Sequence, residues 1–264
     1  MLNTHRPIRV AVLCSQRAPG LLYLLNRSPD RGAAFEIVCA ITSEDTFDEE
    51  VVVERRGIPT RPHPIAAFYH ARGASSLRDP DIRAEYDAES SEMIERFLPD
   101  LILLDGYRYL VTTPLLRRFA NRILNLHFAD LALRTPRGGP RYPGVRAVRN
   151  AIAAGCEETR ASVHLVNDEP DGGTVLVRSW PFPVSSLVGQ LVTADVPDAI
   201  KAYTYAHEQW MMRTASGPLM AAALRLIATG AIDLDSLAAV EPADRTPWLL
   251  EQHGALLAPE LELV

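Results

Sequence analysis

Short apolar runs rich in β-branched residues alternate along the chain with longer stretches whose apolar residues recur at helical spacing. An alternation of this kind favours parallel strands that are joined by right-handed helical crossovers. We therefore predict an α/β fold with a doubly wound, mostly parallel sheet. The runs that predict its strands are residues 8–13, 35–41, 101–104, 122–127 and 162–166.

Helix signals lie between these runs. Asp79 suits an N-cap and Pro80 the first helical position, and apolar residues follow them at near-helical spacing. A further helix is predicted over residues 145–154, where Gly155 stops it. Residues 101–104 are apolar on both faces, which predicts a central strand that is covered on both sides.

The C-terminal third of the chain has a different pattern. Residues 197–228 are predicted to be largely helical, with an interruption at Gly217–Pro218. The last 35 or so residues have weak periodicity, and they suit a small appendage or a dimerisation arm, so a homodimer is one expectation. We predict an α/β domain over residues 1–190, with residues 191–264 as C-terminal helices and an acidic tail packed on that core.

Composition limits the class of protein. The chain has 264 residues, of which 47% are hydrophobic and 23% charged, so we expect one main globular domain. We find no apolar run long enough to cross a bilayer and no secretory signal. We therefore expect a cytoplasmic protein without a membrane partner. Cys14, Cys39 and Cys156 are widely spaced, which predicts reduced thiols and no metal site.

The charge distribution argues against a nucleic-acid partner. The net charge is −6, whereas binding to phosphates needs clustered Lys and Arg. Within this total, the tail from residue 230 to residue 264 contains seven acidic residues and a single Lys or Arg residue, Arg245. We expect a small-molecule substrate instead.

Candidate chemistry lies at the ends of two predicted strands. Asn125 and His127 are two positions apart, so both side chains leave the same face of their strand and can hold an oxygen that becomes negative. Asp171 follows the strand of residues 162–166 and, if it lies near His127, would keep that imidazole protonated. Each element alone has a simpler interpretation, a turn-capping pair or an acidic surface turn. Their combination favours acyl transfer.

Several segments, in one order from about residue 8 to residue 184, resemble the folate-dependent formyltransferases, most closely the glycinamide ribonucleotide formyltransferases. Residues 99–111 (PDLILLDGYRYLV) are similar to the family segment PDLIVLAGYMRIL, and residues 122–127 (RILNLH) to RIINIH. The matches continue with YPG at residues 142–144, with SVHLV at 162–166 for SVHFV, and with DEPDGG at 168–173 for DExDGG. The resemblance implies a Rossmann-like formyltransferase fold.

The resemblance also implies roles for individual residues. Asn125 and His127 would bind the formyl oxygen of 10-formyltetrahydrofolate as co-substrate, and Asp171 would be the catalytic carboxylate. His164 would be a supporting residue, although a buried strand histidine without that role is an equal interpretation. The residues that would bind the folate are Arg83, Arg108, Tyr109, Leu110, Val111, Asp168 and Glu169.

The acceptor side departs from the family pattern. The family's SGNGSN turn, whose amides hold a substrate phosphate, is replaced by CSQRAPG at residues 14–20, so binding of phosphate in that manner is in doubt. Ser15, Gln16, Arg17 and Glu208 are candidate substrate-binding residues. An arginine-rich insert at residues 128–149 also replaces a family segment, and either a solvated loop or an anion-binding element would have this composition.

We therefore predict a formyltransferase that acts on a primary amine of a small molecule, such as a glycinamide ribonucleotide-like acceptor, an amino sugar or a specialised metabolite. A hydrolase of 10-formyltetrahydrofolate is an alternative with the same three residues. Such hydrolases carry an N-terminal regulatory domain, which we do not expect because the first predicted strand begins at Ile8. A catalytically silent folate- or metabolite-binding protein is the alternative from another class.

Overall fold

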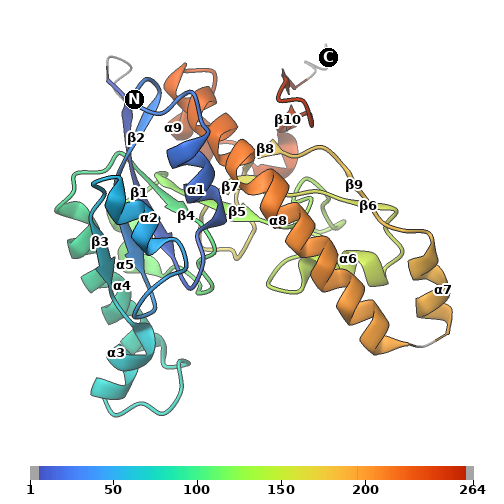
Figure 1. Cartoon of the computed structure of the whole chain (residues 1–264), viewed down its shortest axis with the longest axis horizontal. Coiled ribbons are helices and arrows are strands. Elements are labelled where there is room, and N and C mark those ends of the chain that lie inside the picture. Colours follow the sequence, from blue (N-terminus) through green and yellow to red (C-terminus); the bar gives the residue numbers. More distant parts are fainter. Residues whose placement is uncertain (1–5, 195, 260–264) are drawn as a thin grey trace.

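The computed structural model describes residues 6–194 and 196–259, and one large sheet runs through them (Figure 1). Within these residues the order of its nine strands is β11-β10-β8-β7-β5-β4-β1-β2-β3. Five neighbouring strands are parallel to one another: β1 (Ile8–Cys14), β2 (Phe35–Thr42), β3 (Thr60–Pro62), β4 (Leu101–Leu104) and β5 (Ile123–His127). All four residues of β4 are buried between β1 and β5, as their two apolar faces predict.

The sheet changes direction beyond β5. Strand β7 (Ser162–Leu165) is antiparallel to β5, and β8 (Val175–Arg178) is antiparallel to β7. β10 (Trp248–Leu250) is parallel to β8. β11 (Leu256–Leu257) is antiparallel to β10 and forms the edge of the sheet. β6 (Glu158–Thr159) and β9 (Phe182–Pro183) form a separate pair. The predicted α/β class with a mostly parallel sheet is confirmed.

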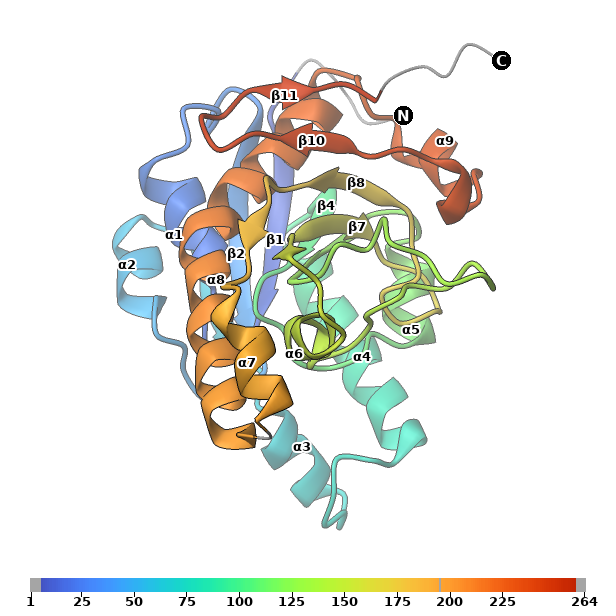
Figure 2. The ribbon, with the colours of Figure 1, turned by 90° about the vertical axis from the view of Figure 1, so that its right-hand side faces the viewer.

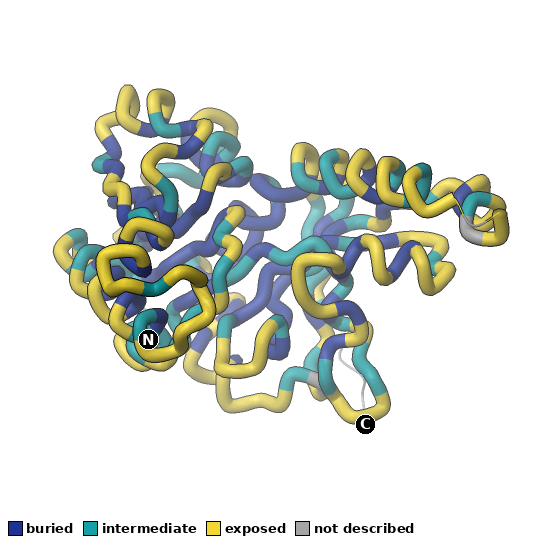
Figure 3. The backbone as a smooth tube through the Cα atoms, turned by 90° about the horizontal axis from the view of Figure 1, so that it is seen from below, coloured by how far each residue is buried: buried dark blue, intermediate teal, exposed yellow. Residues whose placement is uncertain are grey.

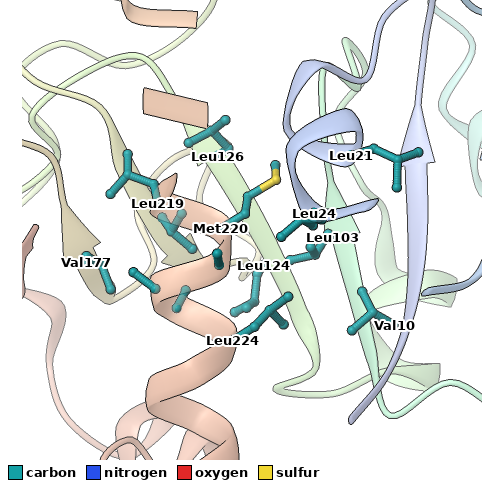
Figure 4. Close-up of a cluster of buried hydrophobic side chains, with 14 of the residues drawn as sticks. Val10, Leu21, Leu24, Leu103, Leu124, Leu126, Val177, Leu219, Met220 and Leu224 are labelled. Atoms are coloured by element: carbon teal, nitrogen blue, oxygen red, sulfur yellow. The ribbon is translucent and has the colours of Figure 1, made fainter. Parts of the chain in front are cut away.

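Helices cover both faces of the sheet (Figure 2). α1 (Pro19–Asn26) and α8 (Pro197–Ala228) pack on one face, and α4 (Pro80–Glu95) and α5 (Thr113–Arg118) pack on the other. Figure 4 shows the first of these layers, in which Leu21, Leu24 and Met220 meet Leu103 and Leu124 of the strands. The alternation along each strand therefore builds two apolar layers, one for each face.

The remaining helices are short and lie around this core. They are α2 (Glu50–Arg55), α3 (Ile65–Ala71), α6 (Ala147–Ala153), α7 (Leu187–Thr193), α9 (Leu234–Ala238) and the 3-10 helix η1 (Pro242–Asp244). The predicted start of α4 is confirmed, because the Asp79 carboxylate accepts from the backbone N–H of Asp81 at 3.0 Å and of Ile82 at 3.2 Å. Figure 3 shows that burial is concentrated in the strands, while loops and outer helix faces are exposed.

α8 differs from the prediction, because the helix continues through Gly217 and Pro218. A Cβ at position 217 would overlap the side chain of Tyr23, so glycine allows α8 to approach α1 closely. Most residues of the helix between 215 and 227 are buried, in a cluster that includes α1 and the strands of the sheet. Tertiary packing therefore stabilises a segment that local propensity marks as broken.

The C-terminal segment contributes strands as well as helices. β10 and β11 extend the edge of the sheet, whereas the sequence predicted no strands there. Glu260 and Glu262 of the acidic tail lie outside the described residues. The division near residue 190 and the homodimer stay predictions. Within the described residues, no helix combines the length and the apolar character needed to cross a membrane.

Candidate active site

The pairing of β5 with β7 brings the first polar residues together. Asn125 lies opposite His164 in the antiparallel register, and its Nδ2 donates to His164 Nε2 at 3.1 Å. The other ring nitrogen, Nδ1, donates to the carbonyl of Leu165 at 3.0 Å. Both contacts fit one neutral tautomer of His164. Burial, reinforced by His127 nearby, lowers the pKa of His164 to about 4.

The loop after β7 places Asp171 beside these residues. Asp171 has a positive φ of 56°, and at Gly173 a Cβ would overlap the carbonyl of Leu165, so this tight turn needs its glycine. The backbone N–H of Gly144 donates to Asp171 Oδ2 at 2.7 Å. Arg134 donates to the carbonyl of Gly172 at 3.1 Å and to that of Gly173 at 3.3 Å. Two residues of the arginine-rich insert therefore fix the position of the carboxylate.

His127 faces the same carboxylate. Its Nε2 lies 3.5 Å from Asp171 Oδ2, and His164 Nε2 lies 3.8 Å from Asp171 Oδ1. Burial lowers the pKa of His127, although Asp171 acts in the opposite direction. The imidazole is therefore neutral near pH 7, whereas the sequence led us to expect a protonated one. The reason is that desolvation of the cation outweighs a carboxylate whose Oδ2 already accepts from Gly144.

The loop of residues 107–111 is held from α4. Arg83 donates from Nε and Nη2 to the carbonyl of Leu110, at 3.1 and 2.7 Å, and from Nη2 to the Tyr107 hydroxyl at 2.9 Å. Its Nη1 lies 2.9 Å from Asp87 Oδ1, and the backbone N–H of Thr112 donates to Asp87 Oδ2 at 2.7 Å. Arg83 is buried under this loop. It fixes the shape of the loop instead of lining the space beyond it.

One cavity of about 580 Å³ joins these groups. We call the part around Asn125, His127, His164 and Asp171 the catalytic end. The part next to the start of α1, around Gln16, Arg17, Pro19 and Asp105, is the α1 end. The other predicted residues that line the cavity are Arg108, Tyr109, Leu110, Val111, Asp168, Glu169 and Glu208.

Two predicted binding residues do not line the cavity. Arg83 lies beneath the loop that it holds, and Ser15 is fully buried. The Oγ atom of Ser15 lies 2.8 Å from Ser43 Oγ and accepts from the backbone N–H of Arg108 at 3.2 Å. Ser15 therefore ties the strand ends together, which differs from the substrate contact expected from the sequence.

Some lining and supporting residues were not identified from the sequence. Asp105, a fully buried acid at the end of β4, lines the cavity. Its signal was a charge directly after four apolar residues, where the family segment has alanine. Gly144 belongs to the YPG match and Arg134 to the arginine-rich insert, but their contacts with the turn that carries Asp171 could not be predicted, because these partners lie 27 to 39 residues away along the chain. Among residues 6–194 and 196–259, no group of three His, Cys, Asp or Glu side chains could hold a metal ion.

The fold agrees with comparisons to known proteins. The model of the formyl transferase family matches residues 8–184, which is more than half of the chain. The chain therefore belongs to the formyl transferase family. The resemblance inferred from the sequence motifs is confirmed.

Individual relatives define the similarity further. The chain is 28% identical over 181 residues to phosphoribosylglycinamide formyltransferase of Haemophilus influenzae, covering 68% of this chain and 76% of that protein. It is 28% identical over 177 residues to formyltetrahydrofolate deformylase of Escherichia coli, covering 67% of this chain and 55% of the relative. The structure of glycinamide ribonucleotide transformylase 1 from Symbiobacterium toebii has a TM-score of 0.61 and 25% identity, over 85% of this chain and 89% of that chain. The chain spans 19% and 43% of the length of two further curated relatives that it matches.

Proposed function

We propose that this protein transfers a formyl group from 10-formyltetrahydrofolate to a primary amine of a small molecule. The observation that carries this proposal is the meeting of Asn125, His127 and Asp171 at the catalytic end of one cavity, with His127 and Asp171 only 3.5 Å apart. An amide, an imidazole and a carboxylate supply two donors for an oxygen and one acceptor for a proton. This set is suited to acyl transfer to an amine.

The reaction follows from the position of each group. The amine nitrogen attacks the formyl carbon, and negative charge develops on the formyl oxygen. Asn125 keeps one amide hydrogen beyond its bond to His164, and a neutral His127 still has one N–H to donate. Both donors stabilise the developing charge. The bond between the formyl carbon and N10 then breaks.

Asp171 handles the proton in this scheme. The attacking amine must lose one proton as the new C–N bond forms, and N10 must gain one as it leaves. The Asp171 carboxylate accepts the first and returns it to N10, so the products are a formamide and tetrahydrofolate. The hydrogen bond from the Gly144 N–H keeps Oδ2 in place beside His127, while Oδ1 faces His164.

The two loops beside the catalytic end support folate as the formyl donor. Residues 107–111 and residues 168–171 line the same cavity, and the first loop is fixed by Arg83 and Asp87. Backbone groups in such loops can bind the polar edge of a pterin, and the exposed Leu110 can cover its ring. No metal is needed for this chemistry.

Hydrolysis of 10-formyltetrahydrofolate is the second candidate. The specific observation in its favour is that Asp171 can deprotonate a water as well as an amine, together with the similarity to formyltetrahydrofolate deformylase over 67% of the chain. The two reactions differ in the group that enters from the α1 end of the cavity.

One assay separates these functions. The protein is incubated with 10-formyltetrahydrofolate and a panel of primary amines, and tetrahydrofolate is followed over time. Amine-dependent release supports formyl transfer, whereas release that is equally fast without any amine supports hydrolysis. Binding of the folate without release would identify a silent binding protein and contradict both proposals.

A further inference from the structure

The α1 end of the cavity contains two carboxylates that accept from the start of a helix. The backbone N–H of Leu21 donates to Asp105 Oδ2 at 2.8 Å, and that of Ala18 donates to Glu49 Oε2 at 2.8 Å. Free N–H groups at a helix start would attract an anion such as phosphate. Here the chain's own side chains already occupy two of these donors.

Asp105 also has an unused oxygen. The residue is 1% exposed and lines the cavity, and its Oδ1 has no hydrogen-bond partner among the described residues. A buried carboxyl oxygen without a partner is costly. A bound ligand that donates from a hydroxyl or ammonium group would satisfy it and would favour the ionised form of Asp105. The α1 end is therefore suited to a group that donates hydrogen bonds.

The charges around the cavity point in the same direction. Its lining contains the acids Asp105, Asp168, Glu169, Asp171 and Glu208, against the arginines Arg17 and Arg108. Both arginines already have acidic partners, because Arg17 lies 3.3 Å from Asp48 and Arg108 lies 3.0 Å from Glu44. Among the described residues that line the cavity, each arginine therefore already has an acidic partner. None is left unpaired to bind a phosphate.

We propose that the acceptor of this enzyme is an amine without a phosphate group, and that Asp105 determines this specificity through a hydrogen bond from an acceptor hydroxyl or ammonium group. This inference rests on the proposed formyl transfer and names the class of its acceptor. A polyhydroxylated amine such as an amino sugar has the required donors. An alanine at position 105 could not accept from the Leu21 amide, so the amide would be free to bind an anion.

The first test measures binding of inorganic phosphate and does not depend on turnover. Phosphate is titrated into the wild-type protein, Asp105→Ala, Asp105→Asn and the exposed control Asp45→Ala, with calorimetry and amide NMR shifts as readouts. We expect saturable binding, at least tenfold tighter than in the wild type, only in Asp105→Ala, because Asn still fills the space. Saturable binding to the wild type at the Ala18 and Leu21 amides would overturn the proposal. So would a folded Asp105→Ala protein that gains no binding.

The second test compares acceptors that differ only in phosphate. Glucosamine and glucosamine 6-phosphate are each offered with 10-formyltetrahydrofolate, and kcat/KM is measured for both. We expect the ratio to favour glucosamine by at least tenfold and to fall in Asp105→Ala. A preference of the wild type for the phosphorylated amine contradicts the specificity. If no amine reacts, formyl transfer itself fails, while the phosphate titration still decides the role of Asp105.

Discussion

The two ends of the cavity place charge in different ways. At the catalytic end two neutral imidazoles surround one carboxylate, and the segments that supply them match the family pattern. At the α1 end a buried carboxylate lies against helix amides, and the segments around it depart from that pattern. The α1 end is therefore the part of the cavity in which this chain departs from the family motifs, and it is the part that we propose receives the acceptor.

Burial gives the two ends of the cavity opposite pH dependences of stability, through Asp105 at the α1 end and His164 at the catalytic end. The larger effect is expected for Asp105. Burial raises the pKa of Asp105 from 3.8 to about 7, so between these values the folded protein holds a proton that the unfolded chain releases. Stability is therefore lost as pH rises through this range, by about 4 kcal/mol. Because His164 has the opposite pH dependence over an overlapping range, urea unfolding at a series of pH values should show this loss as a difference between the wild type and a variant without the Asp105 carboxyl group.

Asp105→Asn isolates that effect, because it removes the titrating group and keeps the shape. The variant should lack the loss of unfolding free energy between about pH 4 and about pH 7, while the exposed control Asp45→Asn should follow the wild type. If the curves of Asp105→Asn and the wild type are parallel, Asp105 is not the group that titrates.

The catalytic end is tested most strongly through its carboxylate. Asp171→Asn keeps the size of the side chain but cannot accept a proton from the attacking group, so kcat should fall by about a hundredfold to a thousandfold. Folate binding should stay within a few-fold of the wild type, because Arg134 still holds the turn through the carbonyls of Gly172 and Gly173. Wild-type turnover in this variant would remove the proposed role of Asp171.

Much of this arrangement could be predicted from the sequence. Strands β4 and β5 follow from local apolar patterns, and the shared face of Asn125 and His127 follows from strand geometry alone. The helical continuity of α8 at Gly217 could not be predicted, because it depends on contact with Tyr23 nearly 200 positions away. The neutral state of His127 was also missed, because its burial is a property of the assembled fold.

His164 provides the opposite pH dependence to Asp105. Its pKa is lowered from 6.5 to about 4, so below pH 6.5 the unfolded chain takes up a proton that the folded protein does not accept. Stability should therefore fall by about 3 kcal/mol as pH drops from 6.5 to about 4. The His164→Asn variant should lose this part of the pH dependence in urea unfolding. An unchanged acid limb in the variant would contradict the neutral tautomer.

The smallest expected effect concerns the arginine-rich insert, which departs from the family pattern but supports the catalytic end. Arg134→Ala removes the donors to the carbonyls of Gly172 and Gly173, so the turn that carries Asp171 should become less well fixed. We expect kcat to fall about tenfold with little change in KM for the amine. Arg137→Ala is the matched control, because Arg137 is exposed in the same segment. Equal rates in the two variants would mean that the insert has no part in positioning Asp171. A rise in KM alone would instead assign Arg134 to binding of the acceptor, and the insert would then act together with the α1 end of the cavity.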